Sequence, residues 1–299
     1  MKRMLTGSIG LIAGVLLATA GALAGSSEVS IEHNGLTLNG RLELAEGKSA
    51  ADGVVLITHG TLAHNRMEIV ATLQDLLAER GLNSLAVTLG LGIDDRKGMF
   101  DCAATQRHRH SDALDEIGAW LAWLKRRGAE GIALLGHSRG GNQTAWFAAE
   151  RDQPSIRAVV LVAPMTWSEA AAAERYRARH GKDLAAVLET ARRAGPDDLL
   201  RKVGFLGCPE ATVSAADFLG YYAPEPRRDT PSLLPRIAKP TLVVAGSADS
   251  VVAGLPERVR GHLDDDTKLV VIEDAGHFFR DFFAEDLADA IKDFLAGRL

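Results

Sequence analysis

One short motif constrains the fold of this chain more than any other feature. The sequence GHSRG at residues 136–140 follows an apolar run and precedes a helical stretch that continues through Ala149. A sharp turn from a strand into a helix needs glycine on both sides, because neighbouring backbone segments approach closely there. The alternative is an ordinary glycine-rich turn, which the preceding strand and the following helix disfavour. The motif therefore predicts that Ser138 is a nucleophile at a strand-to-helix elbow.

Composition narrows the class of protein. The chain has 299 residues, 46% hydrophobic and 24% charged, with 34 Lys and Arg against 39 Asp and Glu and a net charge of −5. These values exclude bulk disorder and a polytopic membrane protein. Nucleic acid is not an expected partner, because phosphate binding needs a clustered basic surface. We expect one sizeable domain with an insertion, and composition leaves its oligomeric state open.

The first 24 residues have the pattern of a secretory signal peptide. Lys2 and Arg3 are followed by an uncharged, largely apolar stretch, and the next charged residue is Glu28. Ala22-Leu23-Ala24 forms an A-x-A cleavage site. We expect cleavage after Ala24 and a secreted or periplasmic protein without membrane contact. An uncleaved anchor helix is the open alternative, since the stretch is long enough to span a bilayer.

Strand-like and helix-like segments alternate along residues 25–299. A β-hairpin is expected over residues 28–44, around the turn dipeptide Asn34-Gly35. Buried strands are expected at residues 53–58, 82–89, 130–135, 156–163, 240–246 and 268–272. Helices are expected at residues 67–80, after an N-cap at Ser111, after the elbow, and at residues 285–295. This order predicts an α/β fold with a mostly parallel central sheet and helices on both faces.

Residues 167–235 interrupt the alternation. The segment is rich in Ala and Arg, shows no convincing strand pattern and indicates several short helices. It begins directly after one expected strand and ends just before another. We therefore expect a helical cap inserted over the carboxyl ends of the strands, within one domain of residues 25–299.

A serine nucleophile needs a base and an acid that orients the base. In this architecture the chain order is serine, acid, histidine. Asp249 follows the strand expected at residues 240–246, and His277 follows the last strand, so both should lie at the same sheet edge as Ser138. Glu273 and Asp274 are rival acids, but they are close to His277 in sequence and too local to orient it. The predicted catalytic residues are Ser138, Asp249 and His277.

The negative charge that develops on a substrate carbonyl oxygen needs fixed backbone donors. One predicted donor is the N–H of Arg139, directly after the nucleophile. The second should come from the loop after the first buried strand, where we assign Thr61, with Leu62 if the register differs by one residue.

These motifs together resemble the α/β-hydrolase superfamily. His59-Gly60 after an early strand, the elbow at Ser138, a G-x-x-D that ends at Asp249 and the Gly before His277 follow the family's order. The resemblance covers about residue 28 to the C-terminus and implies an α/β-hydrolase fold with a cap. Because a serine stands at the elbow, the branches that use aspartate or a thiol nucleophile, such as dehalogenases and dienelactone hydrolases, are disfavoured.

Several conspicuous side chains have no assigned catalytic role. His108 and His110 flank Arg109 and could suggest a metal site with Cys102 or Asp112, but their spacing matches no known ligand set. A solvated loop before Ser111 is the favoured interpretation, and no metal or organic cofactor is expected. Tyr221 and Tyr222 in the cap could line an acyl pocket or pack against the sheet domain.

The two cysteines, Cys102 and Cys208, are expected to form a disulfide. An exported chain meets an oxidising compartment, where paired thiols tend to be bridged. Cys102 lies in the loop after residues 82–89, and Cys208 lies in the cap, so both should be near the active-site edge. The alternative is two separate buried thiols.

The combined prediction is an exported serine hydrolase that acts on a small-molecule acyl substrate, with a carboxylic ester as the favoured bond. An acyltransferase, a thioesterase or a peptidase-type enzyme would use the same triad. A non-catalytic binding module on the same fold is a further alternative, and the complete triad argues against it.

Overall fold

The computed structural model describes residues 25–299. The predicted signal peptide, residues 1–24, lies outside the described residues. Across residues 25–299, none of the helices is both long enough and apolar enough to span a membrane.

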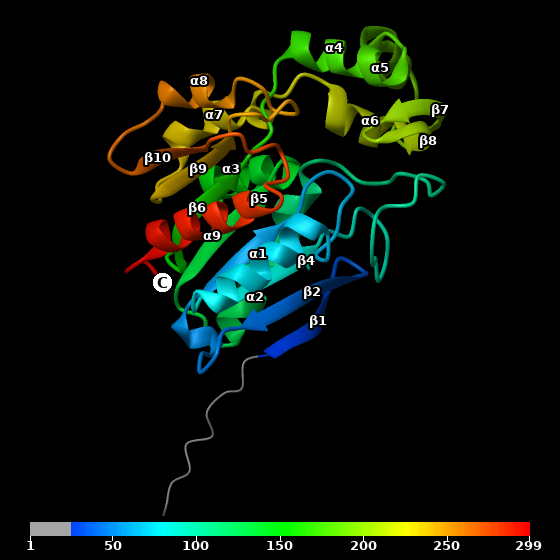
Figure 1. The fold of residues 1–299 in the computed structure, drawn as a ribbon. Helices are drawn as coiled ribbons and strands as arrows, with labels where there is room; N and C mark the ends of the chain where they lie inside the picture. The colour runs from blue at the N-terminus through cyan, green and yellow to red at the C-terminus, as the bar shows by residue number, and fades with distance from the viewer. Residues whose placement is uncertain (1–24) are drawn as a thin grey trace, which may run out of the picture.

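An eight-stranded sheet forms the centre of the described part of the chain (Figure 1). Its order is β1-β2-β4-β3-β5-β6-β9-β10. The first hairpin pairs antiparallel and joins β4 antiparallel, whereas the remaining neighbours are parallel. The bounds are β1 Gly25–His33, β2 Leu36–Leu44, β3 Val54–Thr58, β4 Ser84–Thr88, β5 Ile132–His137, β6 Ile156–Val162, β9 Thr241–Gly246 and β10 Thr267–Ile272.

The sequence patterns explain these strands. β3, β4, β5 and β9 are buried along their whole length, as expected for parallel strands covered on both faces. The β1–β2 hairpin turns at Asn34 and Gly35, which both have positive φ angles of 50° and 79°. That conformation is typical of the two-residue turn that the Asn-Gly dipeptide favours.

Helices cover both faces of the sheet (Figure 1). α1 contacts α9 on one face, and α2 contacts α3 on the other. Their bounds are α1 Glu68–Glu79, α2 Asp112–Arg126, α3 Arg139–Glu150, α8 Leu255–Arg260 and α9 Phe282–Leu295, with a short 3-10 turn η1 at Ala50–Asp52. The α/β fold predicted from the sequence is therefore present.

The expected N-cap at Ser111 is correct in position only. Ser111 precedes α2, but its side chain makes no capping hydrogen bond, because its backbone is already helical at φ −72° and ψ −19°. The Asp112 carboxylate instead accepts a hydrogen bond of 2.7 Å from the backbone N–H of Arg109. The acidic first turn thus stabilises the start of α2 without the serine hydroxyl.

The inserted segment lies above the carboxyl ends of the central strands (Figure 1). It contains α4 Glu169–His180, α5 Leu184–Arg193, β7 Leu199–Phe205, β8 Cys208–Ser214, α6 Ala215–Tyr222, η2 Pro226–Arg228, α7 Thr230–Leu233 and η3 Leu234–Arg236. Here the prediction of an entirely helical cap is wrong, because β7 and β8 form an antiparallel hairpin. Two register shifts interrupt the pairing, so the sequence shows no clean alternation of apolar and polar residues.

The cap has a hydrophobic cluster separate from the main core. Tyr176, Phe205 and Phe218 from the cap pack in it with Leu62 and Phe100 from loops of the sheet domain. Because the cluster includes residues of both the cap and the sheet domain, burial of its apolar surface holds the cap onto the sheet domain.

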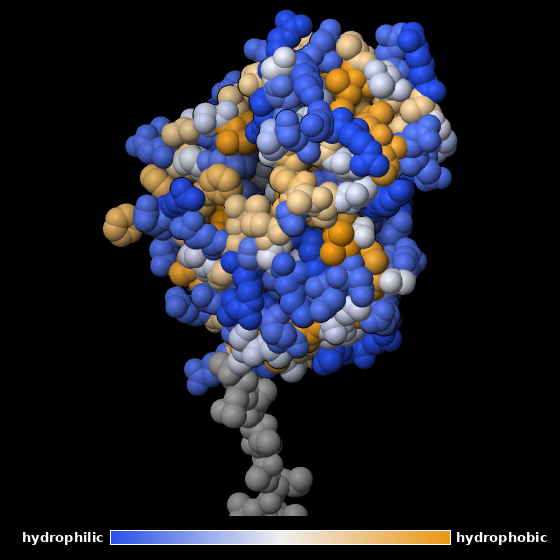
Figure 2. Space-filling model, turned by 90° about the vertical axis from the view of Figure 1, so that its right-hand side faces the viewer, coloured by the Kyte–Doolittle hydropathy of each residue, from blue (hydrophilic) through white to orange (hydrophobic). Residues whose placement is uncertain are grey.

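Hydrophilic side chains cover most of the molecular face shown in Figure 2, with small hydrophobic areas between them.

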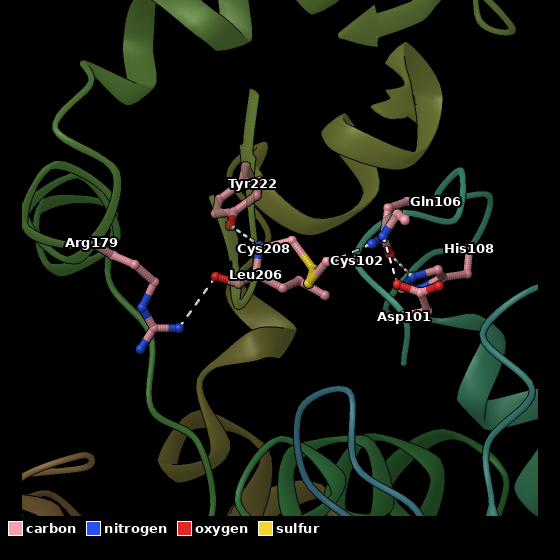
Figure 3. The surroundings of a disulfide bond; sticks show 9 residues. Asp101, Cys102, Gln106, His108, Arg179, Leu206, Cys208 and Tyr222 are labelled. Carbon is pink, nitrogen blue, oxygen red and sulfur yellow. Dashed lines mark hydrogen bonds between the residues drawn. A yellow bond between two sulfur atoms is a disulfide. The ribbon is translucent and has the colours of Figure 1, made fainter. Parts of the chain in front are cut away.

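A disulfide reinforces this attachment. Cys102, in the loop after β4, is bonded to Cys208 at the start of β8, with 5.4 Å between their Cα atoms (Figure 3). The backbone N–H of Gln106 also donates a hydrogen bond of 2.8 Å to the carbonyl oxygen of Thr212. The loop and the cap hairpin are therefore joined both covalently and through the backbone.

Candidate active site

Ser138 occupies a strained turn between β5 and α3. Its backbone has φ 58° and ψ −120°, a conformation that residues with a side chain rarely adopt. The turn depends on its glycines: a Cβ atom at Gly140 would lie 2.2 Å from the carbonyl oxygen of His59. At Gly136, a Cβ atom would lie 2.3 Å from the carbonyl oxygen of Gly140. These close approaches explain why the elbow has glycine on both sides of the serine.

The structure brings Ser138, His277 and Asp249 together from three separate segments. The His277 Nε2 atom lies 2.9 Å from the Ser138 Oγ atom, and its Nδ1 atom lies 2.8 Å from the Asp249 Oδ2 atom. Asp249 follows β9 and His277 follows β10, so both loops lie at the carboxyl edge of the sheet. The side chains of His277 and Asp249 are almost fully buried.

Asp249 is held in an ionised, oriented state. Its Oδ1 atom accepts backbone hydrogen bonds of 2.7 Å from Val251 and 3.1 Å from Val252. Burial alone would raise the pKa of Asp249, but the hydrogen bonds from His277 and the two backbone N–H groups outweigh it, so the pKa is lowered. The rival acid Asp274 is exposed, and no hydrogen bond joins its carboxylate to the His277 ring within the described residues.

His137 supports His277 from behind. The His137 Nε2 atom lies 2.9 Å from the His277 carbonyl oxygen, and the two ring centroids are 4.9 Å apart. Burial, together with the nearby His277, lowers the pKa of His137 to about 4. His137 is therefore neutral at physiological pH, and the contact requires its proton on Nε2, where it donates to the carbonyl.

A cavity of about 160 Å³ opens beside Ser138, between the sheet domain and the cap. Thr61 lines it, but Leu62 does not, and Leu62 packs into the hydrophobic cluster of the cap. The two tyrosines of the cap, Tyr221 and Tyr222, also line it. The full lining is Thr61, Ser138, Arg139, Met165, Thr166, Trp167, Ala172, Arg175, Tyr176, Arg179, His180, Leu206, Tyr221, Tyr222, Arg228, Val251 and Val252.

His108 and His110 are not in a solvated loop, which corrects the interpretation made from the sequence. Both side chains are buried, each at 1% exposure, because the cap covers the loop that carries them. His108 is hydrogen-bonded at 2.8 Å to the Tyr221 hydroxyl and at 2.8 Å to Gln106. His110 is hydrogen-bonded at 2.9 Å to Asn142. The two histidines thus support the floor of the cavity beneath Tyr221.

Metal-ligand geometry is not found at these histidines. Among residues 25–299, no group of three or more His, Cys, Asp and Glu side chains is arranged to hold a metal ion. Burial is the main reason why the pKa of His108 falls to about 3, and Arg96 and Arg139 add to it. Both observations agree with a neutral, structural imidazole at position 108.

Four arginine side chains in the cavity were not assigned from the sequence. They are Arg139, Arg175, Arg179 and Arg228. For Arg175, Arg179 and Arg228, the only signal in the sequence is the arginine-rich composition of residues 167–235, which does not show which arginines point toward Ser138. Arg139 was assigned only for its backbone N–H group, not for its guanidinium. Contacts between distant segments decide this, so the fold was needed to find them.

Solved structures with the same fold include several esterases. Est1E from Butyrivibrio proteoclasticus is 19% identical, with a TM-score of 0.65 over 91% of this chain and 98% of that chain. The esterase domain of a Rhodothermus marinus protein is 16% identical, with a TM-score of 0.60 over 91% and 98%. Dienelactone hydrolase from Anabaena variabilis is 19% identical, with a TM-score of 0.58 over 93% and 100%. At these identities, the similarity establishes the fold alone.

No curated protein sequence matches this chain significantly. The family model described as "Alpha/beta hydrolase family" matches residues 54–290, which include the elbow, the acid and the histidine. The match spans most of the chain, and the sheet order and the cap position agree with it. The chain therefore belongs to the alpha/beta hydrolase family.

Proposed function

We propose that this protein is an exported serine hydrolase that cleaves carboxylic esters through a covalent acyl-enzyme. The observation that carries the proposal is the hydrogen-bonded series Ser138–His277–Asp249 at the wall of a cavity. The esterases among the structural neighbours favour an ester over an amide or a thioester.

The first half of the reaction forms the acyl-enzyme. The Ser138 Oγ atom attacks the ester carbonyl carbon while the His277 Nε2 atom accepts the hydroxyl proton. Asp249 accepts a hydrogen bond from the Nδ1–H group, which keeps Nε2 free as the base and stabilises the imidazolium that forms. When the tetrahedral intermediate collapses, His277 returns the proton to the leaving alcohol.

Backbone N–H groups stabilise the oxyanion of that intermediate. In this proposal the donors are Arg139 at the first turn of α3 and Thr61 in the loop after β3. Within the described residues, neither N–H group makes a hydrogen bond, so both are available to a ligand. The N-terminal end of α3 adds a favourable dipole at the same position. Thr61 is preferred to Leu62, because only Thr61 lines the cavity.

Water completes the reaction. His277 removes a proton from a water molecule, the resulting hydroxide attacks the acyl carbon, and the Ser138 Oγ atom leaves with the proton that His277 returns. The products are a carboxylic acid and the free enzyme. Every step uses side chains and backbone groups of this chain.

A fluorophosphonate probe tests the proposal, because its electrophilic phosphorus reacts readily with an activated serine hydroxyl and not with an ordinary one. We expect labelling of the wild type and none of Ser138→Ala, with a parallel loss of hydrolysis on a panel of esters that includes a ferulate ester. Ser30→Ala is a matched control, since Ser30 is exposed on β1 and distant in the fold. Labelling that persists in Ser138→Ala would exclude Ser138 as the nucleophile.

Export is tested separately. The full chain is expressed in a bacterial host, and the mature N-terminus is sequenced from the periplasmic fraction or the medium. We expect a protein that begins at Gly25. A full-length protein that stays in the membrane fraction would instead support the uncleaved anchor.

A further inference from the structure

The catalytic cavity has an unusual charge composition. Four arginines line it, and none of the lining residues is Asp or Glu. The whole chain carries a net charge of −5, so a general excess of basic residues cannot explain this concentration. Arg139 follows the nucleophile, Arg175 and Arg179 lie on α4, and Arg228 lies in η2.

These arginines lack acidic partners within residues 25–299. Arg139 donates hydrogen bonds to the Thr61 hydroxyl at 3.0 Å and to the His110 ring at 3.3 Å. Arg179 donates to the carbonyl oxygen of Leu206 at 3.3 Å (Figure 3). Each contact is to a neutral group, so the positive charge of each guanidinium is not neutralised.

Arg175 and Arg228 likewise contact only neutral groups. Arg175 donates to the Thr166 carbonyl oxygen at 3.4 Å, and Arg228 donates to the carbonyl oxygens of Tyr221 and Ala223. Residues 25–299 contain no carboxylate within 4.0 Å of any of the four guanidinium groups.

Nearby arginines outside the cavity behave differently. Arg227, the direct neighbour of Arg228, forms ion pairs with Glu225 at 2.7 Å and with Glu150 at 3.3 Å. Arg258 forms one with Asp229 at 2.7 Å. Acidic side chains are therefore present in this part of the fold, but they pair with arginines outside the cavity and not with those that line it.

Arg228 is the most informative of the four. Its side chain is buried at 3% exposure, and its Nε atom is buried without any hydrogen-bond partner in the described residues. Burial, with Arg139 nearby, lowers the pKa of Arg228 to about 10, so it still carries its charge at neutral pH. A buried charge without a counter-ion destabilises a fold, and such groups normally have a partner. An anionic ligand in the cavity would supply one.

We propose that the natural substrate is an ester that also carries a negatively charged oxyanion group, a carboxylate or a phosphate, which binds the four arginines while Ser138 attacks the ester carbonyl. The inference rests on the proposed function and specifies its substrate class. Guanidinium groups suit it because their planar N–H groups bind carboxylate and phosphate in pairs. The charged group is not consumed, so the products are the same acid and alcohol as for any ester.

A purely structural role would explain the position of only some of the four arginines. Arg139 lies over the Tyr221 ring, 5.3 Å from its centroid, and this contact would hold one guanidinium in place. Arg175 and Arg179 are exposed at the mouth of the cavity, where their charge adds little to the packing of the cap. An anionic ligand that reaches from Ser138 to the cap accounts for the arginines near the nucleophile and for Arg175 and Arg179 at the mouth of the cavity.

Matched esters test the proposal. Monoethyl glutarate and ethyl valerate have acyl chains of equal length, and only the first is charged. γ-Acetoxybutyrate and butyl acetate form the same comparison on the alcohol side. We expect kcat/KM to be about tenfold or more higher for the charged ester in at least one pair, and the ratio to fall at high salt.

Arginine variants assign that preference to the cavity. Arg175→Gln and Arg179→Gln should each lower the ratio of charged to neutral kcat/KM about fivefold or more. Arg177→Gln is the matched control, because Arg177 is exposed on the same helix but does not line the cavity. It should leave the ratio unchanged. Thermal unfolding of each variant checks that the fold is retained.

Binding gives a readout independent of hydrolysis. Calorimetry on the Ser138→Ala variant, with glutarate and with inorganic phosphate, shows which of the two oxyanions binds more tightly. Adding the Arg179→Gln substitution to Ser138→Ala should weaken the binding of that oxyanion. Ratios near one that no arginine variant changes, with Ser138-dependent hydrolysis intact, would overturn the inference and leave the proposed function standing. Arginine-dependent binding of glutarate or phosphate without any Ser138-dependent hydrolysis would overturn the proposed function, and with it the ester substrate, and would leave only the binding of an anion by the arginines.

Discussion

The Nε2 atom of His277 lies 2.9 Å from the Oγ atom of Ser138, although 139 sequence positions separate the two residues. Only the fold can hold them at this distance, since His277 follows β10 and Ser138 follows β5. The second ring nitrogen contacts Asp249, so one imidazole joins a hydroxyl to a carboxylate. This arrangement makes the role of each side chain testable.

The acid of the triad can be identified by substitution. Asp249→Asn should lower kcat by about 10³–10⁴-fold, because the amide no longer holds His277 in the required tautomer. His277→Ala should lower it at least as much. Asp274→Asn is the control, since that carboxylate is exposed, and steady-state kinetics on one ester compares all three variants. A larger effect from Asp274→Asn would show that the acid is misassigned.

The elbow glycine tests the backbone geometry. Gly140→Ala should destabilise the protein by about 3 kcal/mol or more, because the new Cβ atom would lie 2.2 Å from the carbonyl oxygen of His59. Gly261→Ala should change stability little, since that glycine has φ −71° and open space around its Cβ position. Chemical denaturation of both variants measures the difference. Equal stabilities would contradict the close packing of the elbow.

The disulfide should stabilise the folded protein and restrict the cap. Cys102 and Cys208 are 106 positions apart, and the chain-entropy model assigns a crosslink of that length about 4 kcal/mol. The Cys102→Ser/Cys208→Ser variant should therefore unfold at a lower temperature. Thiol titration of the denatured, unreduced wild type should find no free thiol. Two free thiols per chain would mean that the crosslink does not form.

Acid should destabilise the protein through its buried histidines. Burial is the main cause that lowers the pKa of His59 and His108 to about 3 and of His137 to about 4. Between these values and 6.5 the unfolded chain binds more protons than the folded one, so stability falls as the pH falls. From pH 6.5 to 5 the expected loss is about 1–2 kcal/mol for each histidine.

Glu116 opposes this trend. Burial raises its pKa to about 7, so the folded state holds an extra proton between pH 4.5 and 7, and its contribution to stability is lost as the pH rises. Unfolding midpoints between pH 5 and 7 should still decrease toward acid, because three histidines outweigh one carboxyl. Glu116→Gln should make the decrease steeper. A midpoint that rises toward pH 5 would contradict the neutral state of the histidines.

Much of the fold was predictable from local patterns. The Asn34-Gly35 turn and the buried strands follow from backbone preferences and hydrophobic periodicity within a few residues. The β7–β8 hairpin was missed for the same reason: its irregular register removes the alternation that identifies a strand. The burial of His108 was also missed, because a cap from a distant part of the chain covers its loop.

The sequence by itself determined the nucleophile elbow and the order of the catalytic motifs, because the GHSRG motif and the strand-like and helix-like segments beside it lie within a few residues of Ser138. The tertiary structure decided which arginines surround the cavity, and it brings Asp249, the acid expected from the chain order, to the His277 ring. Asp249 and Asp274 are both acidic and both near a strand end, and only the packing of β9 beside β10 turns one toward the ring. Hydrogen bonds form only over about 3 Å, so such choices depend on distances that a linear sequence does not contain.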